Sequence, residues 1–251
     1  MKHPTHSLLG ILLACFLLSI ATEAAATPVN DLLVQVRKAR KEARYKDGQL
    51  LIDQAYALAE PESREMAFVL RARAMNRIDQ NHSKEAIPDL ERSLAILQKL
   101  DGPESEAAAS LTNDMAVAYY GIGKLKKAAT WYGKALKMRE TNLGREHIDV
   151  AQTLNNMAWC HRELGQPELA EVEFTRAIAI VRKQEPDGRA LPSYLFGLGS
   201  LQERQGKLKE ALPLLEEAAA KADIAFGKEH PEAKRYRQLL IQVQGQLHEA
   251  S

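Results

Sequence analysis

A pattern of glycine and alanine residues recurs along the chain at intervals of 41 or 42 residues. Gly123 is followed at these intervals by Gly165 and Gly206. Two sets of alanines keep the same steps: Ala128, Ala170 and Ala211, and Ala135, Ala177 and Ala218. A repeating unit of this length is one supersecondary element, and it buries its apolar face by stacking on its neighbours. The sequence therefore predicts an array of stacked units.

Each unit has the spacing of two packed helices. Thr112, Met115 and Ala116 lie at i, i+3 and i+4, which is one face of a helix. Gly123 then ends this first helix, and Ala128 lies on the second. Aromatic residues are only 6% of the chain, and no alternating strand pattern is found. The predicted fold is all-α, an α-solenoid of stacked antiparallel helix pairs.

Four segments are expected along the chain. Residues 1–26 are predicted to be a signal peptide, and residues 27–66 a degenerate helical hairpin that turns at Gly48. The repeat array is expected over residues 67–231. Residues 232–251 are predicted to contain the capping helix that ends a solenoid.

The first 26 residues have the layout of an export signal. Lys2 precedes an apolar run over residues 8–20, and small residues follow at Ala24 and Ala26. The run is shorter than the roughly 20 residues that a membrane span needs. We expect cleavage after Ala26 and export to a periplasm or out of the cell. An alternative is a lipoprotein anchored to the membrane through Cys15.

Two further motifs accompany the repeat. A leucine-glycine turn is followed by a histidine, and the next helix then begins with a leucine-asparagine-asparagine stretch. The residues concerned are Leu143, Gly144, His147, Leu154, Asn155 and Asn156, and the turn recurs at Gly227, His230 and Pro231. Over about residues 67–233 the chain resembles tetratricopeptide repeats, and specifically those of kinesin light chains. The resemblance implies that Asn113 and Asn155 contact the backbone of a bound peptide.

Seven side chains are predicted to line the concave face of the array. They lie one helical position away from the packing face and combine amides, aromatic rings and charges, which suits an extended peptide. Arg162 would favour an acidic stretch in that peptide. A second interpretation of the asparagines is that they bond neighbouring helices and stiffen the array. The seven residues are Arg71, Asn113, Tyr120, Asn155, Trp159, Arg162 and Phe196.

Residues 144–165 contain histidine, cysteine and acidic side chains, as an active site would. However, His147 recurs as His230 in the same slot, which favours a helix cap. Cys160 and His161 are adjacent on one helix, so their side chains diverge by roughly 100°. No CxxC or HExxH motif completes a zinc site. We expect no metal, no cofactor and no catalysis, with Cys160 either packed in the core or linking two chains.

The overall charge narrows the class of partner. Lysine and arginine total 34 and aspartate and glutamate 33. Nucleic-acid binding usually shows as a basic excess or a clustered basic stripe, and neither is evident in the sequence. The predicted function is that of an exported, non-enzymatic adaptor that binds an extended segment of another protein. No small-molecule substrate is expected, and no membrane contact unless Cys15 is lipidated. The alternative is an assembly factor or scaffold for an envelope complex that uses its outer helical faces.

Overall fold

The computed structural model describes residues 28–186 and 188–249, and this part of the chain forms eleven α-helices and no strand. The all-α prediction is confirmed. No helix in the described ranges is both long and apolar enough to cross a membrane. The predicted signal peptide and Cys15 lie outside the described residues. The helices are α2 (Pro28–Lys41), α3 (Tyr45–Leu58), α4 (Arg64–Asp79), α5 (Ser83–Asp101), α6 (Glu106–Gly121), α7 (Leu125–Leu143), α8 (Ile148–Glu163), α9 (Pro167–Gln184), α10 (Leu191–Arg204), α11 (Leu208–Phe226) and α12 (Pro231–Glu249).

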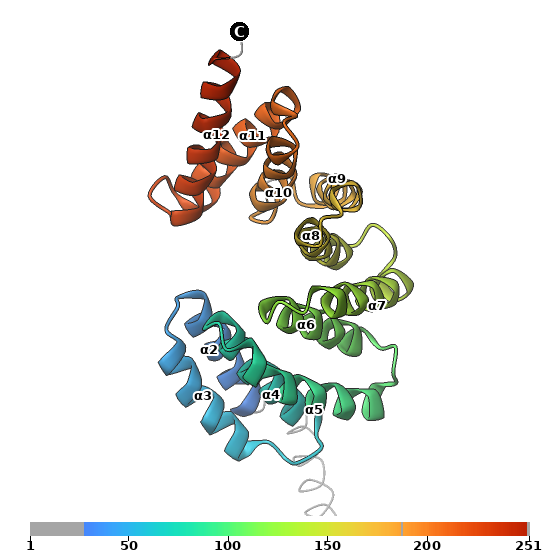
Figure 1. Cartoon of the computed structure of the whole chain (residues 1–251). Helices are drawn as coiled ribbons and strands as arrows, with labels where there is room; N and C mark the ends of the chain where they lie inside the picture. The colour runs from blue at the N-terminus through green and yellow to red at the C-terminus, as the bar shows by residue number, and fades with distance from the viewer. Residues whose placement is uncertain (1–27, 187, 250–251) are drawn as a thin grey trace, which may run out of the picture.

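The helices pack in consecutive pairs, and the pairs stack into an open arc (Figure 1). The pairs are α2–α3, α4–α5, α6–α7, α8–α9 and α10–α11, with α12 packed against α11. The first helix of each pair also contacts the first helix of the next pair, whereas the second helices of successive pairs do not contact each other. The first helices therefore form the inner, concave side of the arc.

Small residues allow the two helices of each pair to approach closely. Ala128, Ala170 and Ala211 are all completely buried, as their place in the repeat predicted. The turns between paired helices have φ angles of +73° at Gly123 and +72° at Gly165. Glycine adopts this left-handed conformation without a steric cost. The repeat pattern thus corresponds to helix contacts and turns, as expected.

The first hairpin turns at a different place from the one predicted. Gly48 is buried inside α3, and the chain turns at residues 42–44, where Ala43 has a φ of 54°. A Cβ atom added at Gly48 would lie 3.2 Å from Oδ1 of Asn76 and 3.8 Å from Cβ of Ala39. The turn prediction is wrong because this glycine serves a close contact of α3 with α2 and α4.

The repeated histidines cap helices, as predicted. Nδ1 of His147 accepts a hydrogen bond from the backbone N–H of Asp149 at 3.2 Å, at the start of α8. Nδ1 of His230 accepts the same bond from Glu232 at 3.3 Å, at the start of α12. These bonds satisfy backbone donors that the first turn of a helix leaves unpaired.

The helix that contains residue 67, where the repeat array was expected to begin, starts three residues before it. Helix α4 starts at Arg64, after Ser63, whose hydroxyl accepts from the backbone N–H of Met66 at 3.0 Å. A serine in this position is a typical helix cap. The described helices before it are therefore α2 and α3 alone, joined to α4 by a short linker.

Candidate peptide-binding surface

Asn113 on α6 and Asn155 on α8 occupy equivalent places on neighbouring inner helices. Their exposed fractions are 4% and 8%. Both Oδ1 atoms are buried and accept no hydrogen bond from any residue that the structure describes. A buried acceptor without a donor costs about 1–3 kcal/mol. The two amides are therefore incomplete hydrogen-bonding groups, and bonds that would stiffen the array are absent from these oxygens.

Trp159 lies one turn beyond Asn155 along α8, Arg162 lies two turns beyond it, and the two form a compact cluster. The guanidinium carbon of Arg162 lies 4.0 Å from the Trp159 ring centroid, and Nη2 donates to Oε1 of Glu163 at 2.7 Å. The ring of Trp159 meets Phe174 edge-on, with centroids 5.5 Å apart. Both Trp159 and Arg162 are half-buried. The charge that was expected to attract an acidic ligand is thus already paired within the protein.

Tyr120 lies near this cluster from the end of α6 and is half-buried. Burial raises the pKa of its hydroxyl, and the charge of Glu163 raises it further, while Arg162 acts in the opposite direction. The phenol therefore stays protonated at neutral pH and keeps its hydrogen-bond donor.

Arg71 on α4 occupies the slot that holds asparagine in the next two repeats. Its Nε donates to Oδ2 of Asp114 at 2.6 Å, and the Asp114 carboxylate, 4% exposed, raises the pKa of the Arg71 guanidinium. Asp114 was not predicted as part of the surface. An alignment of the repeats could have predicted the ion pair. In it, the acidic Asp114 directly follows Asn113, and the slot of Asn113 is occupied by Arg71 in α4. At this position the inner face therefore carries an ion pair, whereas the next two repeats carry an asparagine side chain.

Phe196 does not line the concave face, so its predicted role there is wrong. It is 4% exposed and stacks on Tyr236 of α12, with centroids 4.3 Å apart. The guanidinium carbon of Arg235 lies 4.8 Å from the same ring. The prediction treated α12 as a solvated cap, whereas α12 packs like the first helix of another repeat and covers Phe196.

Cys160 and the adjacent histidine take part in helix packing. The Cys160 side chain is completely buried, its Sγ donates to the backbone oxygen of Leu125 at 3.3 Å, and burial raises its pKa to about 11. His161 Nδ1 lies 2.8 Å from Oε2 of Glu173, whose own pKa is raised by burial. The packing role of Cys160 is confirmed, and a thiol buried in this way is not available to link two chains. Among the described residues, no three histidine, cysteine or acidic side chains are grouped to hold a metal.

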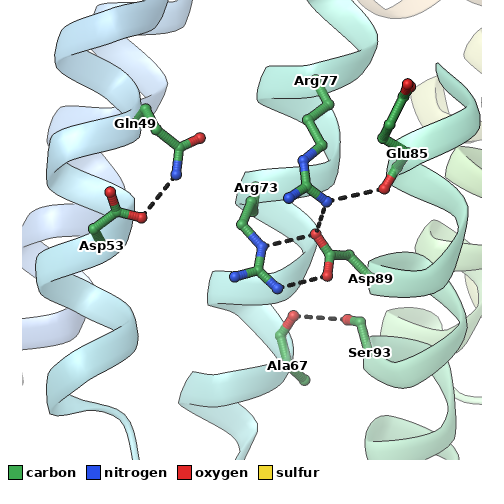
Figure 2. A network of polar contacts seen from close by, with 8 residues as sticks. All are labelled: Gln49, Asp53, Ala67, Arg73, Arg77, Glu85, Asp89 and Ser93. Atoms are coloured by element: carbon green, nitrogen blue, oxygen red, sulfur yellow. Dashed lines mark hydrogen bonds and ion pairs between the residues drawn. The ribbon is translucent and has the colours of Figure 1, made fainter. Parts of the chain in front are cut away.

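A different polar cluster joins α4 to α5, and side chains of the protein itself supply the hydrogen bonds to its carboxylate. Figure 2 shows Asp89 between two arginines of α4. Arg73 donates to both carboxylate oxygens, at 2.8 and 2.7 Å, and Arg77 Nη1 donates to Oδ2 at 2.7 Å and to the backbone oxygen of Glu85 at 2.9 Å. Asp89 is 7% exposed. This cluster, whose carboxylate is hydrogen-bonded through both oxygens, holds a helix pair together. The Oδ1 atoms of Asn113 and Asn155 differ from it, because no described residue donates a hydrogen bond to them.

Comparison with known proteins identifies the family. The tetratricopeptide repeat profile matches residues 64–141, 106–183 and 149–224. The clustered mitochondria protein of Arabidopsis thaliana is 33% identical over 85 residues, which are 34% of this chain and 6% of that protein. This chain therefore corresponds to a small part of that relative.

Solved structures share the fold at low sequence identity. A putative kinesin light chain of Podosopora anserina with nearly identical TPR-like repeats has a TM-score of 0.62 and 18% identity, covering 80% of this chain and 99% of that one. PlcR of Bacillus thuringiensis, in complex with the peptide PapR7 and DNA, has a TM-score of 0.67 and 18% identity, covering 96% and 85%. With three profile matches along most of its length, the chain belongs to the tetratricopeptide repeat family.

Proposed function

We propose that this protein is an adaptor that binds an extended segment of a partner protein on its concave face. The observation that carries the proposal is the pair of buried, unpartnered Oδ1 atoms of Asn113 and Asn155. An extended peptide presents backbone N–H groups along its length, and these are the donors that the two oxygens lack. Trp159 and Tyr120 supply aromatic contacts beside them.

The fold is consistent with this role and with the absence of an enzymatic activity. Tetratricopeptide repeat proteins typically act as scaffolds or adaptors, and the structurally similar PlcR was solved with the peptide PapR7. The buried ionisable groups Cys160 and Glu173 owe their raised pKa values to burial between packed helices. We therefore propose a binding protein without catalytic function.

We further propose that the protein is exported and that the mature chain begins at Thr27. The apolar run and the small residues Ala24 and Ala26 support this proposal. The intact mass of the protein isolated from its native envelope tests it. A mass that begins at Thr27 is expected, and a diacylated species that begins at Cys15 would contradict it.

The function is tested by replacing both asparagines with leucine and crosslinking the protein to its partners in the native envelope. Each lost hydrogen bond is worth about 1 kcal/mol, so the Asn113→Leu/Asn155→Leu variant should lose roughly thirtyfold in affinity for a captured partner. Circular dichroism should report unchanged helix content. Retained capture with intact helices would contradict binding at the amide row.

One observation favours the alternative in which partners dock on the outer face. On α9, Leu169 and Val172 are 50% and 67% exposed, although both are apolar. The matched variant Leu169→Ser/Val172→Ser therefore serves as the comparison in the same crosslinking experiment. If it loses the partner while the asparagine variant keeps it, the protein works as a scaffold through its outer helices.

A further inference from the structure

A separate hollow lies between α2 and α4, at the N-terminal end of the arc and away from Asn113 and Asn155. Its volume is about 380 Å³, within the range of ligand pockets. The apolar part of its lining includes Val34, Phe68 and Met75. Val34 is 57% exposed, and Phe68 and Met75 are half-buried, so apolar surface is accessible here.

The charges around this hollow are predominantly positive. Arg37 lines it, is exposed, and has no acidic partner among the described residues. The second half of α2 reads VRKARK, whereas the one acidic residue of that helix is Asp31 in its first turn. Arg40 also lines the hollow and pairs with Asp79 at 2.8 Å. Since the whole chain carries a net charge of only +1, this is a local basic concentration.

Arg71 places part of a guanidinium group on the same hollow. Asp114 binds its Nε, but no described residue accepts a hydrogen bond from Nη1 or Nη2. These two groups form one edge of the planar fork that binds carboxylates. The Arg71 side chain keeps 37% of its surface exposed. The internal ion pair therefore orients Arg71 and leaves donors for an external anion.

A second hollow adjoins the first across α4. It is lined by α4, α5 and α6, has a volume of about 450 Å³, and shares Phe68 and Arg71 with the first. Its acidic lining residues are Asp101, which is paired with Arg64, and Glu106. Alternate side chains of an extended segment point in opposite directions, about 7 Å apart along each face. Side chains at every second position share a face, so a segment that crosses α4 would place apolar side chains from its first and fifth positions in the two hollows and a carboxylate from its third position at Arg71 between them.

We infer that this N-terminal surface binds an extended segment of a partner protein in which an acidic side chain has one apolar side chain two positions before it and another two positions after it. Arg37 and Arg71 would hold the carboxylate, while Val34, Phe68 and Met75 contact the apolar side chains. The site does not include Asn113 or Asn155, so the inference goes beyond the function proposed above.

The test is fluorescence anisotropy on the full chain with a fluorescein-labelled synthetic peptide of sequence Gly-Leu-Ser-Asp-Ser-Leu-Gly. Two matched peptides replace the aspartate with asparagine or both leucines with serine. The parent peptide should bind at least about ten times more tightly than either, and salt should weaken it. Equal binding of the three peptides, or no binding of the parent peptide, would overturn the inference.

Variants then locate the bound peptide. Arg37→Glu and Val34→Asp change exposed side chains, so both should fold normally and weaken the parent peptide about tenfold. Arg204→Glu makes the same charge change on an exposed arginine at the end of α10 and should leave binding unchanged. The Asn113→Leu/Asn155→Leu variant should also keep full affinity.

The opposite results would assign the surface differently. An equal loss in Arg204→Glu would mean non-specific charge attraction, and a loss in the double asparagine variant would place the peptide on α6 and α8. If the unliganded protein sediments as a dimer that Arg37→Glu dissociates, the surface joins two copies of this chain. Each of these outcomes overturns the inference.

Discussion

The α4–α5 and α8–α9 pairs can be compared residue by residue, because equivalent positions lie 84 residues apart. Arg77 and Asp89 in the first pair correspond to His161 and Glu173 in the second. Asp89 receives three hydrogen bonds from two arginines, whereas Glu173 has His161 alone. The same two slots thus join the helices of a pair in both repeats, but the carboxylate has two partner side chains in the first pair and one in the second.

Another slot keeps its contact although its residue changes. Asn76 donates to the backbone oxygen of Tyr45, the first residue of α3, at 3.3 Å. Cys160, in the same slot, donates to the backbone oxygen of Leu125, the first residue of α7, also at 3.3 Å. The stacking of the repeats therefore determines which backbone group is reached, and the side chain adapts to it.

The slot that holds Arg71 in α4 and Asn155 in α8 differs in whether its polar group has a partner within the protein. Arg71 has an internal partner in Asp114, while Oδ1 of Asn155 has none. Unpaired buried polar groups are rare in folded proteins and need an explanation. The two repeats therefore differ in whether the polar group at this slot is paired within the described part of the protein.

The largest expected effect tests the difference between Asp89 and Glu173. Asp89→Ala leaves Arg73 and Arg77 without their shared carboxylate and should destabilise the protein by about 3 kcal/mol. Glu173→Gln keeps a hydrogen-bonding side chain beside His161 and should cost about 1 kcal/mol or less. Urea denaturation followed by circular dichroism measures both. Equal costs would remove the distinction between the two helix pairs.

The next prediction concerns the thiol of Cys160. Because burial raises its pKa from 9.0 to about 11, the thiolate fraction at pH 8 should fall about a hundredfold. Alkylation by iodoacetamide, measured by mass spectrometry on a Cys15→Ser chain, should be slower by at least that factor than in 8 M urea. Since the folded state favours the protonated thiol, stability should also decrease as the pH rises from about 9 towards 11. Fast alkylation of the folded chain would contradict the buried position.

A smaller effect is expected from overpacking a slot that is alike in all repeats. Ala86, Ala128 and Ala170 are completely buried, so replacing any one with leucine should cost about 1–3 kcal/mol. Thermal unfolding of the three variants should give similar losses. Ala179→Leu, on the exposed side of α9, is the control and should change little. An unchanged melting temperature for the buried variants would mean that the repeat register is wrong.

The repeat pattern was sufficient to predict the helix pairs, the buried alanines and the histidine caps, because each depends on local spacing within one unit. Gly48 was misassigned because a glycine needed for helix contact has the same sequence signal as one in a turn. Phe196 was misassigned because its burial depends on α12, which lies far along the chain from it. These errors concern contacts between elements, which periodicity alone does not specify.

The candidate surface was predicted less completely than the fold. Asn113 and Asn155 were identified through the family motif, but their burial and the missing partners of their oxygens were visible only in the structure. Asp114 was missed because its role depends on Arg71, which lies 43 residues away on another helix. The pairing of Arg162 with Glu163 could not be inferred either, since neighbouring charges on a helix often stay unpaired.

The most direct test of the central claim is the stability of the unliganded Asn155→Leu variant. If Oδ1 of Asn155 is a buried acceptor kept free for a ligand, leucine removes an uncompensated polar group and should raise the free energy of unfolding by about 1 kcal/mol. Urea denaturation, with Asn142→Leu on α7 as the control at a hydrogen-bonded asparagine, measures this change. The account predicts a higher urea midpoint for Asn155→Leu together with weaker partner binding. A lower midpoint would show that the asparagine stabilises the array, and would contradict the claim.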